Sequence, residues 1–233
     1  MKGNDKMKIG VIGALSSEVE LFCEKLEGKK TTSFKYMTIY EGKIGENEVA
    51  ICCSSIGKVN AAVAVQILID RFGCEAIINS GIAGALGDNV SILDVVISDV
   101  LTYHDADMDI FVKYPPFGLE YSADTHLVNM AKKACQKVMD KERKLHIGKI
   151  VSGDRFVCKS EVKEEIKSRT RALCLEMEGA AVAQASVINE VPFVVIRTMS
   201  DSANDGGSMD YDKFEKIAAK SSAEIVYELI KSL

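Results

Sequence analysis

Tryptophan is absent from this sequence, and proline and histidine occur only three times each. The longest apolar runs, such as Val191–Ile196, fall far short of the about 20 residues that a membrane-spanning helix requires. The net charge is −5, and no segment is rich in Lys and Arg. These absences argue against a membrane protein and against a nucleic-acid-binding protein.

The first residues, "MKGNDKMKIG", lack the apolar core of a signal peptide, so a cytoplasmic protein is expected. Met7 is a candidate natural start. On that hypothesis residues 1–6 form a short mobile N-terminal extension, and residues 7–233 form a single domain.

The seven cysteines are odd in number and include no C-x-x-C pair. Most lie within apolar stretches, which favours reduced thiols that serve as small hydrophobic side chains. Because the three histidines are far apart in the sequence, a zinc site is not expected. The sequence therefore indicates no metal and no cofactor.

Apolar runs alternate with helical patterns along most of the chain, which is typical of an α/β fold with a mixed central sheet. The expected strands are Lys8–Ala14, two within Phe34–Ser55 joined by a turn near Gly45–Asn47, Ala76–Gly81, Asp94–Leu101, Leu145–Gly153, Ala172–Met177 and Pro192–Asp201. The expected helices are Ser16–Leu26 with Ser16 or Ser17 as N-cap, Gly57–Gly73, Asp124–Lys141, Ser160–Arg169, Glu178–Asn189 and Asp210–Leu233. The glycine-spaced segment Ser80–Asp88 and the polar segment Thr102–Asp124 are expected to be loops. One three-layer α/β/α domain accounts for this order of elements.

In such folds, ligands bind at the carboxyl ends of the strands, where three acidic motifs fall. Asp201 ends an apolar strand interrupted by Arg197, so it is a candidate general acid or a simple turn cap. Glu176 and Glu178 flank Met177 at a strand-to-helix junction. They either favour the helix N-terminus or divide two roles, one binding sugar hydroxyls and the other pairing with Arg197.

Three further segments are weaker candidates. Glu18 lies in the first turn of a helix, where the dipole alone explains an acidic residue. The segment "YHDAD" (Tyr103–Asp107) has too few ligands to require a metal, and a polar loop is favoured. Phe156 in "SGDRF" follows a strand, where it would either stack on a flat base or join the core.

Taken in order, the motifs resemble those of the 5′-methylthioadenosine/S-adenosylhomocysteine nucleosidases of the nucleoside phosphorylase superfamily. They are "KIGVIGALSSEVE", "SSIGKVNAA", "INSGIAGAL", "YHDAD", "IVSGDRF", "LEMEGAAVAQ" and "VIRTMSDSAND". The resemblance runs from about Met7 to the C-terminus. It implies a nucleoside phosphorylase-like fold and hydrolysis of the bond between adenine and ribose, without metal or cofactor.

The resemblance also implies roles for particular residues. Asp201 would protonate adenine N7, Glu178 would bind the ribose hydroxyls and stabilise a cationic sugar, and Glu18 would orient the attacking water. The other implied substrate-binding residues are Phe156 and Val157 at the adenine, Met177 at the ribose, Glu176 and Arg197 near the water and sugar, Ser200 beside Asp201, Tyr211 beside the ligand, the Ile82, Ala83 and Gly84 segment, and the pocket residues Leu15 and Ile56.

Ile82 departs from the family pattern, because many members have a hydroxyl residue at this position. An isoleucine side chain cannot donate that hydrogen bond, so water positioning would depend more on Glu18 and Arg197.

Three alternatives remain open from sequence: a phosphate-dependent nucleoside phosphorylase, an aminodeoxyfutalosine nucleosidase and a non-catalytic nucleoside-binding protein. The segment "GALSSEVE" has no Lys or Arg to bind phosphate, which favours hydrolysis. The family suggests a homodimer, and the segment Thr102–Asp124, with Phe111, Pro115 and Phe117, is the candidate contact.

Overall fold

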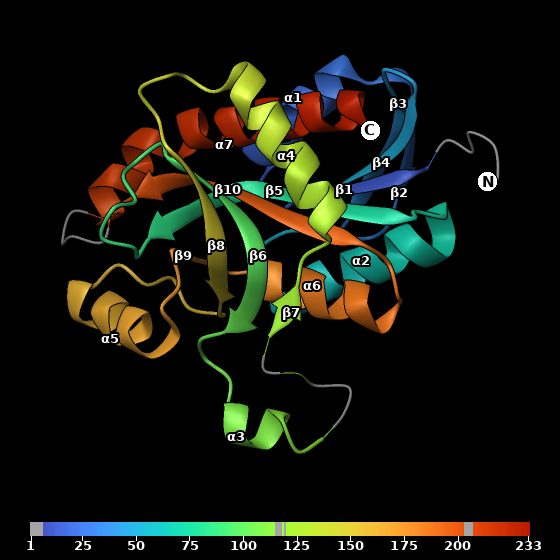
Figure 1. Cartoon of the computed structure of the whole chain (residues 1–233). Coiled ribbons are helices and arrows are strands. Elements are labelled where there is room, and N and C mark those ends of the chain that lie inside the picture. The colour runs from blue at the N-terminus through green and yellow to red at the C-terminus, as the bar shows by residue number, and fades with distance from the viewer. Residues whose placement is uncertain (1–6, 115–117, 119, 203–206) are drawn as a thin grey trace.

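The apolar stretches of the chain form the central strands of one mixed β-sheet (Figure 1). The computed structural model describes residues 7–114, 118, 120–202 and 207–233. The expected N-terminal extension, residues 1–6, lies outside the described residues.

The described residues contain ten strands. They are β1 (Ile9–Gly13), β2 (Glu27–Ser33), β3 (Thr38–Ile44), β4 (Asn47–Cys53), β5 (Ala76–Ala85), β6 (Val95–Tyr103), β7 (Tyr121–Ser122), β8 (Leu145–Ser152), β9 (Cys174–Glu176) and β10 (Phe193–Asp201). Their order is β10-β6-β8-β9-β5-β1-β4-β3-β2, and β7 pairs with β6. Because β10 also pairs with β5, the strands β10, β6, β8, β9 and β5 close into a ring.

Helices cover both faces of the sheet, as the alternating pattern predicts. They are α1 (Ser16–Lys25), α2 (Lys58–Phe72), α3 (Met108–Phe111), α4 (Thr125–Val138), α5 (Ser160–Thr170), α6 (Gly179–Ile188) and α7 (Gly207–Ser232). Helices α1, α4 and α7 pack on one face, whereas α2 and α6 pack together on the other (Figure 1). The three-layer α/β/α prediction is therefore confirmed.

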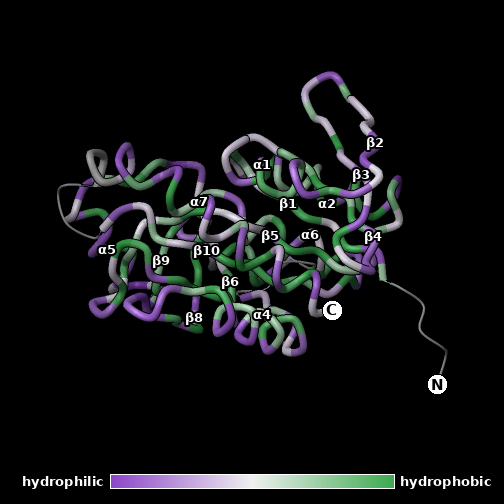
Figure 2. The backbone as a smooth tube through the Cα atoms, turned by 90° about the horizontal axis from the view of Figure 1, so that it is seen from above, coloured by the Kyte–Doolittle hydropathy of each residue, from purple (hydrophilic) through white to green (hydrophobic). Residues whose placement is uncertain are grey.

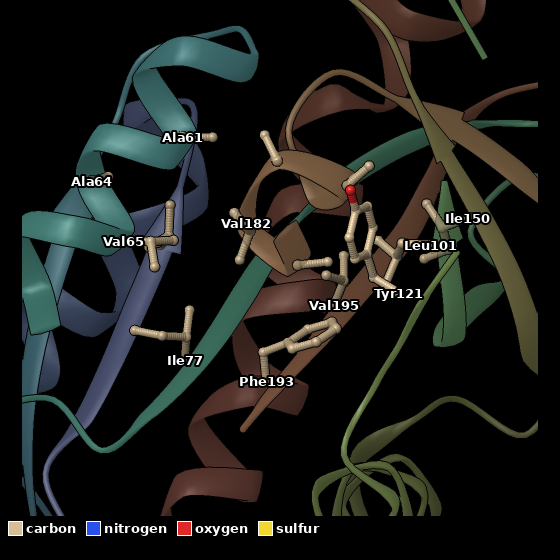
Figure 3. Packing of buried hydrophobic residues seen from close by; sticks show 14 of the residues in the cluster. Ala61, Ala64, Val65, Ile77, Leu101, Tyr121, Ile150, Val182, Phe193 and Val195 are labelled. Atoms are coloured by element: carbon tan, nitrogen blue, oxygen red, sulfur yellow. The ribbon is translucent and has the colours of Figure 1, made fainter. Parts of the chain in front are cut away.

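Each face of the sheet has its own hydrophobic core. Figure 3 shows the core beneath α2 and α6, in which Ala64 and Val65 of α2 and Val182 of α6 pack near Ile77 and Val195 of the strands. The opposite core joins β1, β4, β5 and β10 to α1, α4 and α7. Strands β1 and β10 are buried along their whole length, as expected of central strands covered on both faces.

Strand β5 is longer than predicted, since it continues through the glycine-spaced segment to Ala85 instead of becoming a loop at Gly81. Its small residues pair in parallel with β10 from Ile77 to Gly84. The prediction of a loop was wrong because glycine spacing was taken as a turn signal, whereas here it permits close packing between buried strands.

Strand β2 was not predicted, because every one of its residues is exposed and its sequence, "EGKKTTS", has no apolar face. Pairing with β3 alone defines it, and the resulting hairpin projects from the body of the protein (Figure 2). Lys29 and Lys30 lie on this edge strand. Charged residues at such a position discourage pairing with another chain.

The segment Thr102–Asp124 is not a continuous loop. Strand β6 extends to Tyr103, and α3 and β7 follow. Asp124, expected inside α4, is its N-cap, and its carboxylate accepts a hydrogen bond from the Leu127 amide at 2.8 Å.

Two helix starts also differ from expectation. The N-cap of α1 is Leu15 rather than a serine, and α7 begins at Gly207 rather than Asp210. Along α7, Ala218, Ile225 and Leu229 are buried, whereas Ile217 is 47% exposed. None of the described helices is long and apolar enough to cross a membrane.

Candidate active site

One cavity lies at the carboxyl ends of the central strands and gathers the acidic motifs that the sequence places there. The space within it that the centres of water molecules can occupy is about 100 Å³. It is lined by Ala14, Leu15, Glu18, Ile56, Ile82, Ala83, Gly84, Arg155, Phe156, Val157, Leu175, Glu176, Met177, Glu178, Ser200, Asp201 and Tyr211. Apart from Arg197, every residue predicted for the site belongs to this lining.

Glu18 reaches the cavity from the first turn of α1, which follows β1 directly. One carboxylate oxygen accepts hydrogen bonds from the amides of Ala14 (2.6 Å) and Leu15 (2.9 Å), and the other accepts one from Ile82 (3.0 Å). Burial raises the pKa of Glu18, although Arg197 and these three amides oppose the effect. A buried carboxylate with a raised pKa suits a group that takes a proton near neutral pH.

Glu178 stands at the N-cap position of α6, and its carboxylate accepts a hydrogen bond from the Gly57 amide at 2.9 Å. Its pKa is raised, first by burial and then by the neighbouring Glu176 carboxylate. The side chain thus connects the strand-to-helix junction after β9 with the start of α2. This position leaves it in the cavity lining, two residues from Glu176.

Glu176 has a different environment, although it is only two residues away. Its carboxylate accepts hydrogen bonds from the amides of Glu178 (3.0 Å) and Gly179 (2.7 Å), from the Ser152 hydroxyl and from the Arg197 guanidinium. The predicted pairing of one glutamate with Arg197 is therefore confirmed. Glu176 also accepts hydrogen bonds from the first amides of α6, as the helix N-terminus interpretation predicts.

Arg197 does not line the cavity but lies beneath it, 1% exposed, on β10. Its guanidinium donates to Asn79 Oδ1 at 2.6 Å as well as to Glu176, and it approaches the Glu178 carboxylate at 4.0 Å. One buried cation thus offsets part of the negative charge of the site, as buried charges require.

Asp201 is the last residue of β10, and both of its carboxylate oxygens have a donor. The Ser200 hydroxyl donates to Oδ1 at 2.9 Å, and the Lys163 ammonium lies 2.7 Å from Oδ2. The register with β5 shifts between Met199 and Asp201, which marks a β-bulge at Ser200. A bulge re-aims the side chains that follow it, and here it sets the direction of Asp201.

Two glycines of β5 make room for these acids. A Cβ at Gly81 would lie 2.6 Å from Glu18 Oε1, and a Cβ at Gly84 would lie 2.8 Å from Asp201 Oδ2. Contacts this short do not occur with real Cβ atoms. The glycine spacing of "GIAG" is thus required by the two carboxylates on either side of the strand.

Aromatic residues stand at the mouth of the cavity. Phe156 is 56% exposed and meets Tyr211 edge to face, with ring centroids 5.5 Å apart. An exposed aromatic ring beside a polar cavity is available to stack on a planar base. Phe156 is therefore not an ordinary core residue, which was the alternative interpretation.

Sequence reasoning missed Lys163 and Arg155, which bring positive charge to the site, and Asn79 and Ser152, which hold Arg197 and Glu176. Lys163 lies in the strongly charged helix "SEVKEEIKSR", where no feature of the sequence separates a buried lysine from exposed ones. In the segment "YHDAD", Asp105 forms an ion pair with Lys58 at 2.8 Å. Within the described residues no group of three or more His, Cys, Asp or Glu side chains is placed to hold a metal ion.

Comparison with known proteins agrees with the geometry. The family model of the phosphorylase superfamily matches residues 8–231. The 5′-methylthioadenosine/S-adenosylhomocysteine nucleosidase of Staphylococcus carnosus is 40% identical over 230 residues, covering 97% of this chain and all of the relative. That of Maridesulfovibrio salexigens is 37% identical over 233 residues, also covering 97% of this chain and all of the relative.

Solved structures lead to the same family. The nucleosidase of Neisseria meningitidis in complex with methylthio-immucillin-A is 39% identical, with a TM-score of 0.92 over 97% of this chain and 99% of that one. The S-adenosylhomocysteine nucleosidase of Streptococcus pyogenes in complex with 5-methylthiotubericidin is 35% identical, with a TM-score of 0.92 over 99% of both chains. From this cavity and these matches it follows that the chain belongs to the 5′-methylthioadenosine/S-adenosylhomocysteine nucleosidase family of the phosphorylase superfamily.

Proposed function

We propose that this protein hydrolyses the N-glycosidic bond of 5′-methylthioadenosine and S-adenosylhomocysteine, releasing adenine and the 5-thio-substituted ribose. The observation that carries the proposal is the meeting of Glu18, Glu178 and Asp201, from three separate strand ends, in one cavity with an aromatic mouth. The reaction would serve methionine salvage and recycling of the methyl cycle. It uses water and needs no cofactor.

The chemistry divides between the two ends of the scissile bond. Adenine leaves poorly as an anion, so protonation of N7 by Asp201 lowers the barrier, a form of help typically worth about 10²–10⁴ in rate. The ribose becomes cationic as the bond breaks, and a carboxylate close to it stabilises that charge. Glu178 has this role in the proposal, with Met177 against the sugar and Phe156 stacked on the base.

Glu18 receives the proton of the attacking water. Its three backbone donors fix the direction of the carboxylate, and the pKa raised by burial brings its proton affinity closer to that of a general base at neutral pH. Ile82 supplies a backbone amide to Glu18 but no hydroxyl group. Water positioning in this protein therefore depends on the carboxylate and its amide donors.

Water rather than phosphate is the proposed nucleophile. The nucleophile side of the cavity carries the Glu18 carboxylate, and the segment that follows β1 has no Lys or Arg. A carboxylate there repels phosphate, and Arg197 beneath it is already engaged with Glu176.

Release of free adenine in phosphate-free buffer tests the proposal directly. Methylthioadenosine, S-adenosylhomocysteine and aminodeoxyfutalosine should be compared as substrates. Turnover that requires added phosphate and yields a ribose 1-phosphate would overturn hydrolysis. Asp201→Asn should abolish adenine release from methylthioadenosine and leave its affinity largely unchanged, and undiminished activity would reject the role of Asp201.

We also propose a homodimer, which the exposed apolar residues beside the cavity support. Val59 is 74% exposed on α2, close to the cavity residue Ile56, and α2 packs against α6. Other exposed large apolar residues are Ile56 before α2, Val63 on α2, Val187 and Ile188 on α6, and Ile110, Val112 and Tyr114 in and just after α3. Of the residues expected at the contact, Phe111 packs inward against Tyr103, and Pro115 and Phe117 lie outside the described residues.

Sedimentation equilibrium tests the dimer. Val59→Glu should shift the protein toward monomer, whereas Tyr36→Glu, at a comparably exposed site on the β2–β3 hairpin, should not. A wild-type monomer at micromolar concentration would reject the proposal.

A cytoplasmic location is part of the proposal. All seven cysteines are free, and burial raises the pKa of Cys52, Cys74 and Cys135 to about 12, which keeps these thiols neutral and unreactive. Reduced cysteines used as core residues suit a reducing compartment.

A further inference from the structure

Lys163 is a fully buried lysine that the proposed reaction does not use. It lies on α5, its side chain is 1% exposed, and its ammonium contacts Asp201 Oδ2 at 2.7 Å and the backbone carbonyl of Ser202. Lys167, one turn further along the same helix, instead pairs with the exposed Asp88 at the surface. A lysine is very seldom buried unless it is paired, so its contact with Asp201 requires an explanation.

Lys163 lies behind the acid as seen from the ligand. Asp201 lines the cavity, while Lys163 is not part of the lining formed by the described residues. The Ser200 hydroxyl donates to the other carboxylate oxygen at 2.9 Å. The space beside Gly84 is open enough for the carboxylate only because that residue has no side chain. Together these contacts fix the carboxyl group of Asp201 in position.

The donors around Asp201 match the carboxylate, which is the form that the residue takes after it has given its proton away. Hydrogen bonds from a charged donor to a carboxylate are about twice as strong as neutral ones. Interactions that strengthen as charge develops lower the barrier, whereas equal binding of both forms does not. The ammonium of Lys163, in contact with Asp201, therefore favours transfer of the Asp201 proton to the base.

We propose that Lys163 is a positioning residue that acts through Asp201, holding its carboxyl group toward the nucleobase and stabilising the negative charge left when the proton moves to N7. This inference rests on the proposed nucleosidase function. In the step, the O–H bond of Asp201 breaks and the N7–H bond forms, while the C1′–N9 bond breaks and its electron pair moves to the purine. A bond from the water oxygen to C1′ forms, and the water gives a proton to Glu18. Lys163 keeps its own proton, and after adenine leaves, Asp201 regains a proton from water.

Apart from Lys163, the titratable groups near Asp201 are a thiol, a phenol and the other charged residues that line the cavity. Cys174 on β9 and Tyr211 on α7 interact with Asp201, and burial raises the pKa of both, so they are neutral near neutral pH. Glu18 and Glu178 line the same cavity, as does Arg155. Loss of Lys163 therefore removes the positive charge in contact with Asp201 and leaves the acidic groups of the cavity in place.

The first test is Lys163→Met, with Lys167→Met as a matched control on the same helix. For methylthioadenosine, Lys163→Met should lower kcat by about 10- to 100-fold, a part of the about 10²–10⁴ that general acid catalysis contributes, with KM changed by less than about threefold. Its pH–rate profile should differ from that of the wild type, because the positive charge in contact with Asp201 is gone. Lys163→Arg should restore part of the rate, and Lys167→Met should match the wild type.

A second substrate separates this role from a structural one. In a 4-nitrophenyl 5-thiomethylriboside the phenolate leaves as a stable anion and needs no proton. Lys163→Met should hydrolyse it within about threefold of the wild-type rate, because only the protonated leaving group depends on Asp201. In an Asp201→Asn background, where adenine release is already abolished, Lys163→Met should likewise not slow hydrolysis of the nitrophenyl riboside, because this leaving group needs no proton.

The possible outcomes are distinguishable. Equal losses on both substrates, an unchanged pH profile or slower hydrolysis of the riboside in the Asp201→Asn background would each overturn the role of Lys163. Failure of the wild-type protein to release adenine from any of the nucleosides would instead overturn the proposed function. If Lys163→Met does not fold, Lys163→Arg and its pH profile still decide, because an arginine keeps the positive charge next to Asp201 and should retain the pH–rate profile of the wild type.

Discussion

Gly84→Ala should damage the reaction much more than the fold. The added Cβ would lie 2.8 Å from Asp201 Oδ2, and contacts below 3.0 Å do not occur with real Cβ atoms. Gly84 does not have a positive φ, so alanine meets no backbone strain there. The carboxylate of Asp201 must therefore move away, and its contacts with Ser200 and Lys163 must stretch or break.

The size of the effect follows from this geometry. A displacement of about 1 Å at a reacting group can cost about 10²-fold in rate, so a retreat of several tenths of an ångström should lower kcat by about 10- to 100-fold. Overpacking a buried site costs about 1–3 kcal/mol in the free energy of unfolding. At the upper end of that range, Gly84→Ala would still be folded, given the about 5–15 kcal/mol typical of native proteins.

Gly87→Ala is the matched control. Its Cβ would lie 2.9 Å from Val90 Cγ2, which is similar crowding two residues beyond the end of β5 and outside the cavity lining. Both variants should lose comparable stability in urea titrations. Only Gly84→Ala should lose kcat when adenine release from methylthioadenosine is measured in phosphate-free buffer. If its kcat stays within twofold of Gly87→Ala, then the position of Asp201 does not limit the reaction.

Three further predictions concern the other charged and polar groups. Burial raises the pKa of Glu178, so its stabilising contribution is present below the ordinary glutamate pKa and is lost as pH rises toward the pKa of the folded protein. Over this pH range, the free energy of unfolding of the wild type, measured in urea, should fall relative to that of Glu178→Gln by at most about 1.4 kcal/mol per pH unit. Parallel curves for the two proteins would contradict this prediction. Arg197→Met leaves Glu176 and Glu178 without their buried cation. The free energy of unfolding should therefore drop by about 3–5 kcal/mol at pH 7 and by less at pH 5, where carboxyl groups gain protons. An equal loss at both pH values would argue against charge as the cause. Ser200→Ala removes the donor to Asp201 Oδ1 and should lower kcat about tenfold with little change in KM, whereas a change confined to KM would place the hydroxyl at the substrate instead.

Much of the site could be predicted from sequence because its residues follow buried strands. Asp201 comes at the end of β10, Glu18 follows β1, and Glu178 follows β9, and strand ends are visible as the limits of apolar runs. The carboxyl ends of the parallel strands β1, β5 and β10 meet at one edge of the sheet, so Glu18 and Asp201 could be brought together without coordinates. Strand β9 runs antiparallel to β5, so this rule does not place Glu178.

Charged residues on helices could not be assigned in the same way. Lys163 and Lys167 stand four residues apart in a helix with acidic neighbours, and the sequence pattern gives both the same solvated character. Only the approach of α5 to the end of β10 buries one of them. Strand β2 was missed for a related reason, since it is defined by its partner β3 and not by any pattern of its own.

The bulge at Ser200 separates the part of β10 that packs into the hydrophobic cores from the residue that reaches the cavity. As far as Met199, β10 keeps regular register with β5 and most of its apolar side chains fill the two cores. Beyond Met199, a single irregular step decides which group faces the cavity. Substitutions in β10 before Ser200 should therefore act mainly on stability, and substitutions after it mainly on catalysis. Such a scaffold can acquire a different residue at the end of β10, and with it a different reactivity, while its two hydrophobic cores stay unchanged.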